Sequence, residues 1–569
     1  MGDARLAALA ERFWRFECRE TPLAAILAGQ PTEDEIVFRE SAADHARRDA
    51  GATDMLDALA AIPAEGLDDQ DRATRILLER ELRAIRDLYA VQAHLRPWLL
   101  PAGPDFNTVF FANSSAIADS AGAALYLDRL STIPAFMADI RANLAAGHAM
   151  GIRYPRAVLE GAAANTRGMI AGDAEHLPWY GPFKRSAAGG QVGVQAAGER
   201  ALTLIRDEIV PAMAGYADDL TGALSAGARE SLSCCDTPGG RAYYETFVRH
   251  FTTTGMTPDE VHALGLDEVA RLERALDALA AEAGHAGDIA GYRTFLTSDA
   301  QFVAESPDAL RATLESLCKR IDKRIPAYFG RIPRITYGVE TMPAALSANM
   351  PPAYAQPSPA DRSAPGIFWA SAIPAKCPSY MHVALAVHEA WPGHLMHIAL
   401  MHEQDGLPEF RRHGAVKYTA CVEGWALYCE GLAAEMGLYQ TPHEHYGRLE
   451  MEMWRAVRLV VDTGIHWFGW SRDRAIAYMA ERLALSAETI AGEVDRYAAL
   501  PAQALAYQIG NLRIRALRAR AEAVLGDRFS HRGFHDAITG VGAVTLPVLD
   551  DLIGAWIDRE AAMPQAAAA

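Results

Sequence analysis

The stretch ALAVHEAWPGHLMHIALMHEQ, residues 384–404, is the most informative part of the chain for its fold class and its chemistry. A helical metallopeptidase carries the pattern His-Glu-x-x-His, in which two imidazoles one turn apart bind the metal and the Glu acts as base. His388 and Glu389 fit this pattern, but Pro392 occupies the place of the second His, and the next imidazole is His394. The stretch is therefore either a zinc site with an insertion or two unrelated histidines beside a broken helix.

Helical geometry separates these two interpretations. On a straight helix, side chains six residues apart point about 120° away from each other, so His388 and His394 could not share an ion. Pro392 has no N–H to donate to the carbonyl of residue 388, and Gly393 can adopt backbone angles that other residues avoid. We therefore expect a kink or bulge at Trp-Pro-Gly that returns His394 to the side that His388 faces.

A third ligand is predicted in TACVEGWALYCEGLAAEMG, residues 419–437. This segment has the apolar character of a buried helix, where a carboxylate is unfavourable unless a cation meets it. Zinc sites in helical peptidases often take one Glu from a second helix. We therefore predict Zn²⁺ bound by His388, His394 and Glu423. Glu430 lies on the same helix face, either to orient a His ligand or as a solvated position.

The rest of the chain reads as mostly helical. Apolar residues recur at three- and four-residue steps over 72–95 and 266–283, and Thr257 followed by Pro258 is typical of a helix start. Two segments predict strands, 334–342 and 366–372, with a long proline-rich loop between them. The predicted fold is a large, mostly α, two-lobed molecule with a deep central cleft and a small β-sheet.

Length suggests how the lobes divide. A chain of 569 residues exceeds one ordinary core. We expect an N-terminal helical lobe over 1–240, a lobe carrying the zinc site over 241–560, and a frayed tail over 561–569. The loop at 233–241 is the expected boundary.

Charge, hydropathy and cysteine spacing exclude several classes of partner and of location. A net charge of -18 argues against nucleic acid, and no apolar run is long enough for a membrane span. The acidic, amphipathic first residues do not resemble a secretion signal, and the seven cysteines form no C-x-x-C pair, so we expect a cytoplasmic protein with reduced thiols. The expected partner is a small peptide or amide substrate, and a homodimer is left open.

Several runs together resemble a known family. HEAWPGH, VEGWALYCEGL, RLVVDTGIHWFGWSRDRAIAYM and LPAQALAYQIGNL are similar to the bacterial family named domain of unknown function 885, which is grouped with zinc-peptidase-like proteins. The resemblance covers most of residues 240–515. It implies His388, His394 and Glu423 as metal ligands, Glu389 as general base, and a fold similar to the clefted, zincin-like helical peptidases.

The chain departs from the family pattern at two positions. His397 stands where the family usually has Gln, and it could compete as a ligand. Gln508 stands where the family usually has Lys, which would alter the substrate charge that the cleft wall tolerates.

Amide hydrolysis sets the remaining roles. Glu389 would take a proton from a zinc-activated water and pass it to the leaving amine. The developing oxyanion needs donors, for which His466, Tyr507 and Arg458 are candidates. Arg458 could instead pair with Asp462 one turn later. The segment 366–372 could be an edge strand that pairs with an extended substrate.

Three function classes follow from these residues. The first is a metallopeptidase or related amide hydrolase acting on short peptides. The second is a zinc enzyme acting on a non-peptide metabolite by hydrolysis or elimination. The third is a non-catalytic binding protein on the same fold, against which Glu389 speaks, because a binding site has no use for a base between two ligands. The sequence does not separate the first two classes.

Overall fold

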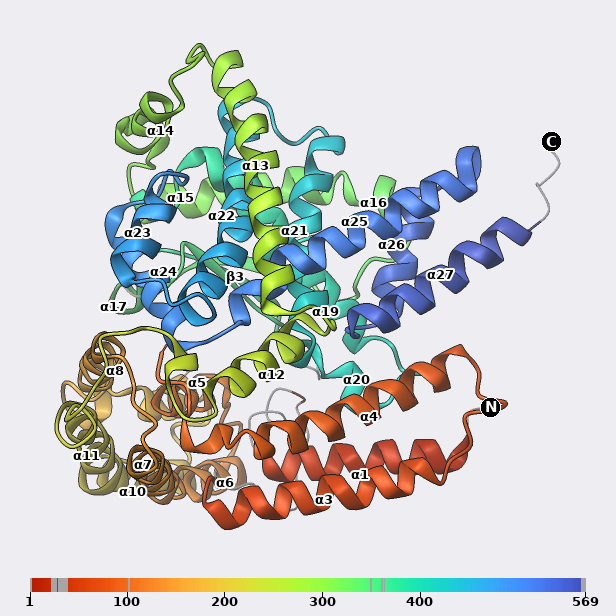
Figure 1. Cartoon of the computed structure of the whole chain (residues 1–569). Helices are drawn as coiled ribbons and strands as arrows, with labels where there is room; N and C mark the ends of the chain where they lie inside the picture. Colours follow the sequence, from red (N-terminus) through yellow and green to blue (C-terminus); the bar gives the residue numbers. More distant parts are fainter. Residues whose placement is uncertain are drawn as a thin grey trace.

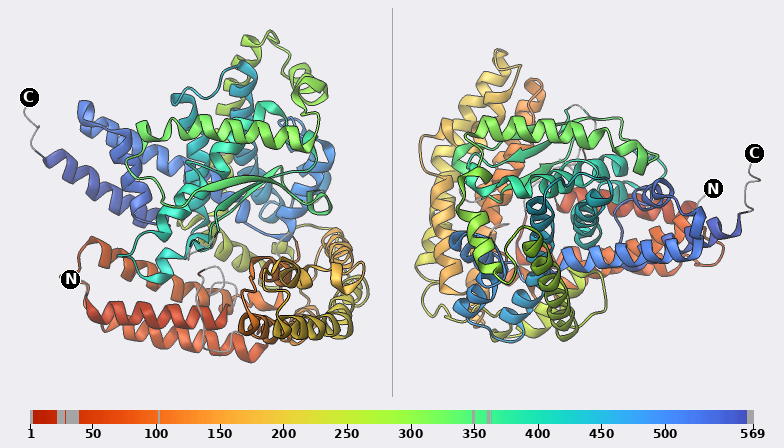
Figure 2. Two further views of the ribbon diagram at one scale, coloured as in Figure 1. Left: turned by 180° about the vertical axis from the view of Figure 1, so that it is seen from behind. Right: turned by 90° about the horizontal axis from the view of Figure 1, so that it is seen from above.

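The computed structural model describes residues 3–21, 28, 39–100, 103–347, 350–359, 362 and 364–563. Helices dominate, and they gather in two layers (Figure 1). The N-terminal helices, red to olive, form the lower layer, and the green to blue helices form the upper one. Figure 2 shows the same separation from behind.

The lower layer begins with long amphipathic helices, as the apolar periodicity predicts. The helix predicted over 72–95 ends earlier than expected, at Ala90, because Gln92 adopts a left-handed backbone with φ 54°. The helices of this layer are α1 (Ala4–Glu20), α3 (Ala42–Ala60), α4 (Asp69–Ala90), α5 (Pro104–Ser114), α6 (Ser120–Leu130), α7 (Ile133–Ala149), α8 (Arg156–Met169), α9 (Gly181–Arg185), α10 (Val192–Leu204) and α11 (Val210–Thr221). Next along the chain comes α12 (Gly240–Thr252).

The upper layer contains the predicted site. Its first helix starts as expected: the Thr257 hydroxyl accepts from the Glu260 N–H, and the Glu260 side chain accepts in return. The helices are α13 (Pro258–Glu282), α14 (Ile289–Ser298), α15 (Pro307–Asp322), α16 (Ile325–Tyr328), α17 (Ala344–Ser347), α18 (His382–Glu389), α19 (His394–His402), α20 (Glu409–Arg412), α21 (Thr419–Glu435), α22 (Pro442–His466), α23 (Arg472–Ala480), α24 (Ala487–Ala499), α25 (Ala506–Leu525), α26 (His531–Gly540) and α27 (Leu546–Ala562). The tail predicted from residue 561 thus begins inside α27, and residues 564–569 lie outside the described part.

A small sheet lies beside these helices. It consists of β1 (Tyr337–Thr341), β2 (Ala353–Gln356) and β3 (Gly366–Ala370), in the order β1-β3-β2. β1 is parallel to β3, and β2 is antiparallel to it. Both predicted strands are confirmed, but β2 lies in the segment expected to be a loop. The expectation of an edge strand at 366–372 is wrong, because β3 is central and both of its sides are already paired.

One apolar core connects the layers. The buried cluster extends from Leu6 of α1 to Ile557 of α27 and includes side chains from both layers. All seven cysteines are free of disulfides, as expected. Among the described helices, none is both long and apolar enough to span a bilayer. A pocket lined by residues such as Arg96, Trp98 and Pro501 contains none of the predicted zinc ligands.

Candidate metal centre

The two histidines lie on separate helices. α18 ends at Glu389 and α19 begins at His394, and the Trp391–Pro392 peptide bond between them is cis. A Cβ on Gly393 would lie 2.0 Å from the His388 carbonyl oxygen, so only glycine fits at this position. The helix is therefore fully interrupted, which is a larger change than the predicted kink. The interruption has the expected effect on the histidines, because it places His394 on the side that faces His388.

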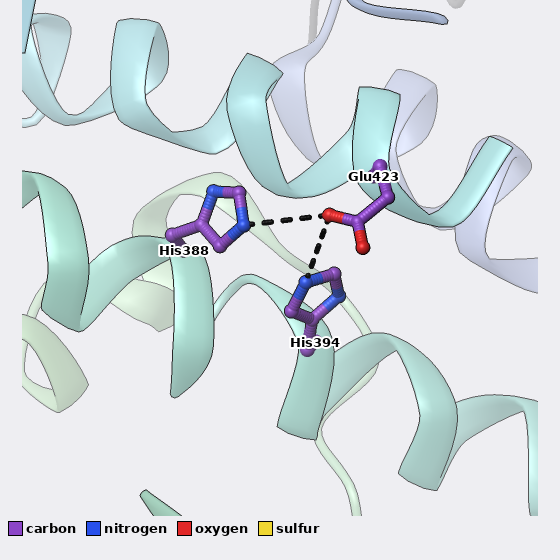
Figure 3. A group of neighbouring side chains, drawn as sticks. All are labelled: His388, His394 and Glu423. Carbon is purple, nitrogen blue, oxygen red and sulfur yellow. Dashed lines mark ion pairs between the residues drawn. The ribbon is translucent and has the colours of Figure 1, made fainter. Parts of the chain in front are cut away.

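Three ligand atoms converge on one point (Figure 3). His388 Nε2 lies 3.5 Å from Glu423 Oε2, and His394 Nε2 lies 3.3 Å from the same oxygen. One ligand atom from each of the three side chains lies within 4.8 Å of the others. Two neighbouring helical segments and α21 thus bring together the three residues that the sequence predicts as ligands.

The spacing fits a tetrahedral zinc ion. With ligand bonds of about 2.0–2.1 Å, the edge of a zinc tetrahedron is about 3.4 Å. The two separations from Glu423 Oε2 to the histidine nitrogens, 3.5 and 3.3 Å, bracket this edge and exceed an ordinary N–H···O distance. Glu423 Oε2 is buried and has no hydrogen-bond partner among the described residues. A buried carboxylate oxygen in this state is costly unless a cation meets it.

The charges of the site also favour a cation. Burial would raise the pKa of Glu423, but His394 and His388 outweigh it and hold that pKa well below its usual range. Burial alone would lower the pKa of His388. The carboxylates of Glu423 and Glu430, with the charge of Glu389, instead raise it to about 9. The same carboxylates would attract a divalent ion, which must displace the proton from His388 in order to bind.

Glu430 orients one of the ligands. Its Oε1 lies 2.8 Å from His388 Nδ1, and its side chain is 1% exposed. Arg455 Nη2 lies 3.8 Å from the same carboxylate oxygen. Of the two roles left open for Glu430, the structure supports the one in which it fixes the ring of His388, because a carboxylate on Nδ1 directs Nε2 toward the metal.

Trp425 secures the interruption between the two helices. Its Nε1 donates to the Pro392 carbonyl over 2.9 Å from the buried helix α21. The sequence shows Trp425 only as a packing residue. In the structure its indole ties the helix that carries Glu423 to the segment that positions His394.

Glu389 and Tyr507 lie at the edge of the metal centre. Glu389 directly follows His388 at the end of α18 and is 9% exposed. Tyr507 is on α25, which crosses α21 closely at a pair of glycines. A Cβ on Gly424 of α21 would lie 2.4 Å from the carbonyl carbon of Gly510 on α25, so this crossing brings the start of α25 close to Glu423. Burial, and next the charge of Glu423, raise the pKa of Tyr507, so its phenol stays protonated. Tyr507 can therefore donate a hydrogen bond near the metal ligands.

Arg458 does not form the pair with Asp462 that helical spacing allows. Its Nη2 lies 3.2 Å from Glu493 Oε2, and its guanidinium lies 4.6 Å from the centre of the Tyr507 ring. Asp462 instead accepts from the Tyr244 hydroxyl at 2.7 Å and from a backbone N–H. The predicted pair is wrong because long-range partners reach both side chains.

His466 is a structural residue. Its Nε2 lies 2.9 Å from the Tyr497 carbonyl, and its Nδ1 accepts from the Cys234 N–H at 3.2 Å. The side chain is fully buried, and this burial lowers its pKa to about 3. The expectation that His466 stabilises an oxyanion is wrong, because the backbone occupies both ring nitrogens.

Neither of the two departures from the family pattern joins the converging ligand atoms. His397 is not in the converging group; it is 1% exposed, and burial, and next His394, lower its pKa to about 3. Gln508 is fully buried, and its Nε2 donates to Glu268 Oε2 at 2.8 Å. It joins α25 to α13, so the expectation that it faces substrate from the cleft wall is wrong.

Arg455 is a further residue of the metal centre, and it is not among the predicted site residues. It lies one turn before Arg458 in the apolar run of α22 and is 5% exposed. An arginine within so apolar a stretch is a usable signal, because an arginine is rarely buried without an acidic partner. Its partner Glu430 is on another helix, where no local pattern could reveal it.

Comparison with solved structures supports the fold. One neighbour is described as "the putative lipoprotein from Colwellia psychrerythraea"; it has a TM-score of 0.89 and 26% identity, covering 97% of this chain and 99% of that one. Another is described as "a putative lipoprotein of unknown function from Shewanella oneidensis"; it has a TM-score of 0.72 and 16% identity, covering 97% and 100%. The comparison with curated proteins gave no match.

A family comparison extends over nearly the whole chain. The match is to the family described as "Bacterial protein of unknown function (DUF885)" and covers residues 22–553. This range includes the lower helical layer apart from α1, the small sheet and every residue of the metal centre. The chain therefore belongs to the DUF885 family of bacterial proteins.

Proposed function

We propose that the protein is a zinc-dependent hydrolase that cleaves amide bonds in short peptides or peptide-like small molecules. The observation that carries this proposal is the convergence of His388, His394 and Glu423 at the spacing of a zinc tetrahedron, with Glu389 beside them. In this proposal HEAWPGH is a zinc-peptidase signature in which an interrupted helix replaces one continuous turn.

Each nearby side chain has a role in amide hydrolysis. Bound zinc would lower the pKa of a water toward neutrality and polarise the scissile carbonyl. Glu389 accepts the proton of the attacking water and delivers it to the leaving amine. Tyr507, kept protonated by burial and by the charge of Glu423, donates to the oxygen that gains negative charge. Glu430 holds His388 in the tautomer that a metal ligand needs.

We also propose a zincin-like fold in which the site, carried by the upper layer, opens into a cleft between the two layers. The low exposure of the ligands, 3% for His388 and 9% for His394, supports small substrates, because a folded protein could not reach them. The net charge of -18 supports a small-molecule substrate over nucleic acid.

The test combines metal analysis with a base variant. Purified protein should carry about one zinc, and Glu389→Gln should keep that zinc while turnover of a peptide and N-acyl amino acid panel falls at least about a hundredfold. Glu409→Gln is a matched control, because Glu409 pairs with Arg412 and His413 and does not contact the three ligands. Full activity of Glu389→Gln would refute the assignment of the base. Protein without zinc and without turnover would refute the proposed function.

A further inference from the structure

A group of charged side chains with low exposure lies next to Tyr507. Arg458 of α22 shares the carboxylate of Glu493 with Arg496 of α24. Arg496 contacts both oxygens of Glu493, at 2.8 and 2.9 Å, whereas Arg458 reaches one oxygen at 3.2 Å. Two guanidinium groups therefore share one acid, which leaves an excess of positive charge around Arg458, whose side chain is 7% exposed.

Arg458 also has an unused nitrogen. Its Nε donates to the Tyr497 hydroxyl at 3.1 Å, but its Nη1 is buried without a hydrogen-bond partner among the described residues. The nearest acid along the helix, Asp462, is already bonded to Tyr244 and to a backbone N–H. A buried guanidinium nitrogen without an acceptor is unfavourable, so a ligand that supplies an acceptor would be favoured here.

Arg458 is close to the proposed reaction site. Its guanidinium lies 4.6 Å from the centre of the Tyr507 ring, and the charge of Glu423 acts on the Tyr507 hydroxyl. Tyr507 lies one turn before Gly510 on α25, and Gly510 closely approaches Gly424, the residue that follows the predicted zinc ligand Glu423. The side chain of Tyr507 is only partly buried, whereas Arg458 is buried. An anionic group bound by Arg458 would therefore lie beside the scissile amide.

Arg455 has its own partners and does not share this role. Its Nη2 lies 3.8 Å from Glu430, and its Nη1 donates to the Met451 carbonyl at 3.2 Å. Its charge balances the carboxylate that orients His388. Arg455 Nε is also buried without a hydrogen-bond partner among the described residues, so the feature that distinguishes Arg458 is the single acid that it shares with Arg496.

We propose that Arg458 binds the terminal carboxylate of the substrate, so that the preferred substrates are short peptides or N-acyl amino acids with a free carboxylate one or two residues beyond the scissile bond. This inference rests on the proposed function. Arg458 is a specificity residue here, because it contacts the end of the substrate and takes no part in the proton transfers of Glu389. An N–H···carboxylate bond between ions is among the stronger hydrogen bonds.

The test uses matched ligands that differ only in their terminal group. Zinc-loaded protein is titrated calorimetrically with an N-acetyl amino acid and with its amide, and the corresponding N-acyl dipeptide acid and amide are assayed for hydrolysis. The wild type should prefer each acid by about tenfold or more, and Arg458→Gln should reduce this ratio to about threefold or less. Arg472→Gln, which removes an arginine on α23 that pairs with Asp495 on α24, should keep the wild-type ratio.

Two further measurements keep the outcome interpretable. Arg458→Lys retains the charge without the planar fork, so an intermediate ratio supports the proposal even if Arg458→Gln fails to fold. Zinc content and circular dichroism report folding of each variant. Equal binding of acid and amide by the wild type, or an unchanged ratio in Arg458→Gln, would overturn the subsite. Selective binding of the acid that depends on Arg458, without hydrolysis of any substrate, would support the subsite and refute the proposed function.

Discussion

The hydrogen bond between Glu430 and His388 leads to a quantitative prediction for Glu430→Gln. The bond is 2.8 Å long, and the carboxylate is 1% exposed, so neither water nor a neighbouring acid can replace it. Glutamine has nearly the same shape and keeps one acceptor oxygen, but it removes the charge that favours the cation. Loss of such a partner lowers metal affinity by about 10- to 100-fold, which is about 1.4–2.7 kcal/mol.

Competition with a chromogenic zinc chelator measures this change directly. Glu435→Gln, on the same helix but paired at the surface with Arg518, is the control and should leave zinc affinity unchanged. Circular dichroism would show that both variants fold. Zinc affinity of folded Glu430→Gln within about threefold of wild type would refute the role of Glu430, because a ligand-orienting bond could not be removed at so small a cost.

Three further substitutions test other parts of the structure. Glu423→Ala should release the zinc, as measured by metal analysis, and retention of a full equivalent would move the third ligand elsewhere. Gly393→Ala should lower the free energy of unfolding in denaturant by about 3 kcal/mol or more, because the added Cβ would overlap the His388 carbonyl. Gly431→Ala is the control, because the space around Gly431 is open, and it should change the free energy of unfolding little. Equal effects of the two substitutions would contradict the close approach at Gly393. Burial raises the pKa of Asp462 to about 7, so the folded state keeps this proton at pH values at which the unfolded chain has released it. The resulting stabilisation is fully present below the unfolded pKa and is lost as pH rises through the folded pKa. Relative to Asp462→Asn, the wild type should therefore lose roughly 2–3 kcal/mol of unfolding free energy between pH 5 and pH 7, and a pH-independent difference would contradict that pKa.

Local chemistry explains why much of the fold could be predicted. The start of α13 at Thr257 depends on a hydroxyl, a proline and an acid within four consecutive residues, and all of them are visible in the sequence. The interruption between His388 and His394 is also local, because a missing N–H at Pro392 and a missing side chain at Gly393 act on their own neighbours. The ligand set followed from these signals together with one acid in an apolar helix.

Long-range partners decided what the sequence left open or predicted wrongly. The role of Glu430 became clear only when α21 was placed against α18, and His466 was excluded only when the Tyr497 carbonyl was found on its ring. Similarly, the order of strands placed β3 at the centre of its sheet. None of these contacts lies within one helix turn or one strand, so no periodicity could encode them.

The sequence by itself therefore determined the mostly helical class, the break at Trp-Pro-Gly and the identity of three candidate ligands, because each depends on backbone chemistry or burial within a few residues. Only the tertiary structure decided which polar groups around these ligands remain free to bind a substrate. The backbone occupies both nitrogens of His466, whereas one nitrogen of Arg458 has no hydrogen-bond partner in the part of the chain that the structure describes. The physical reason is that hydrogen-bond partners and shared charges come from segments far apart in the chain, which meet only when the helices assemble.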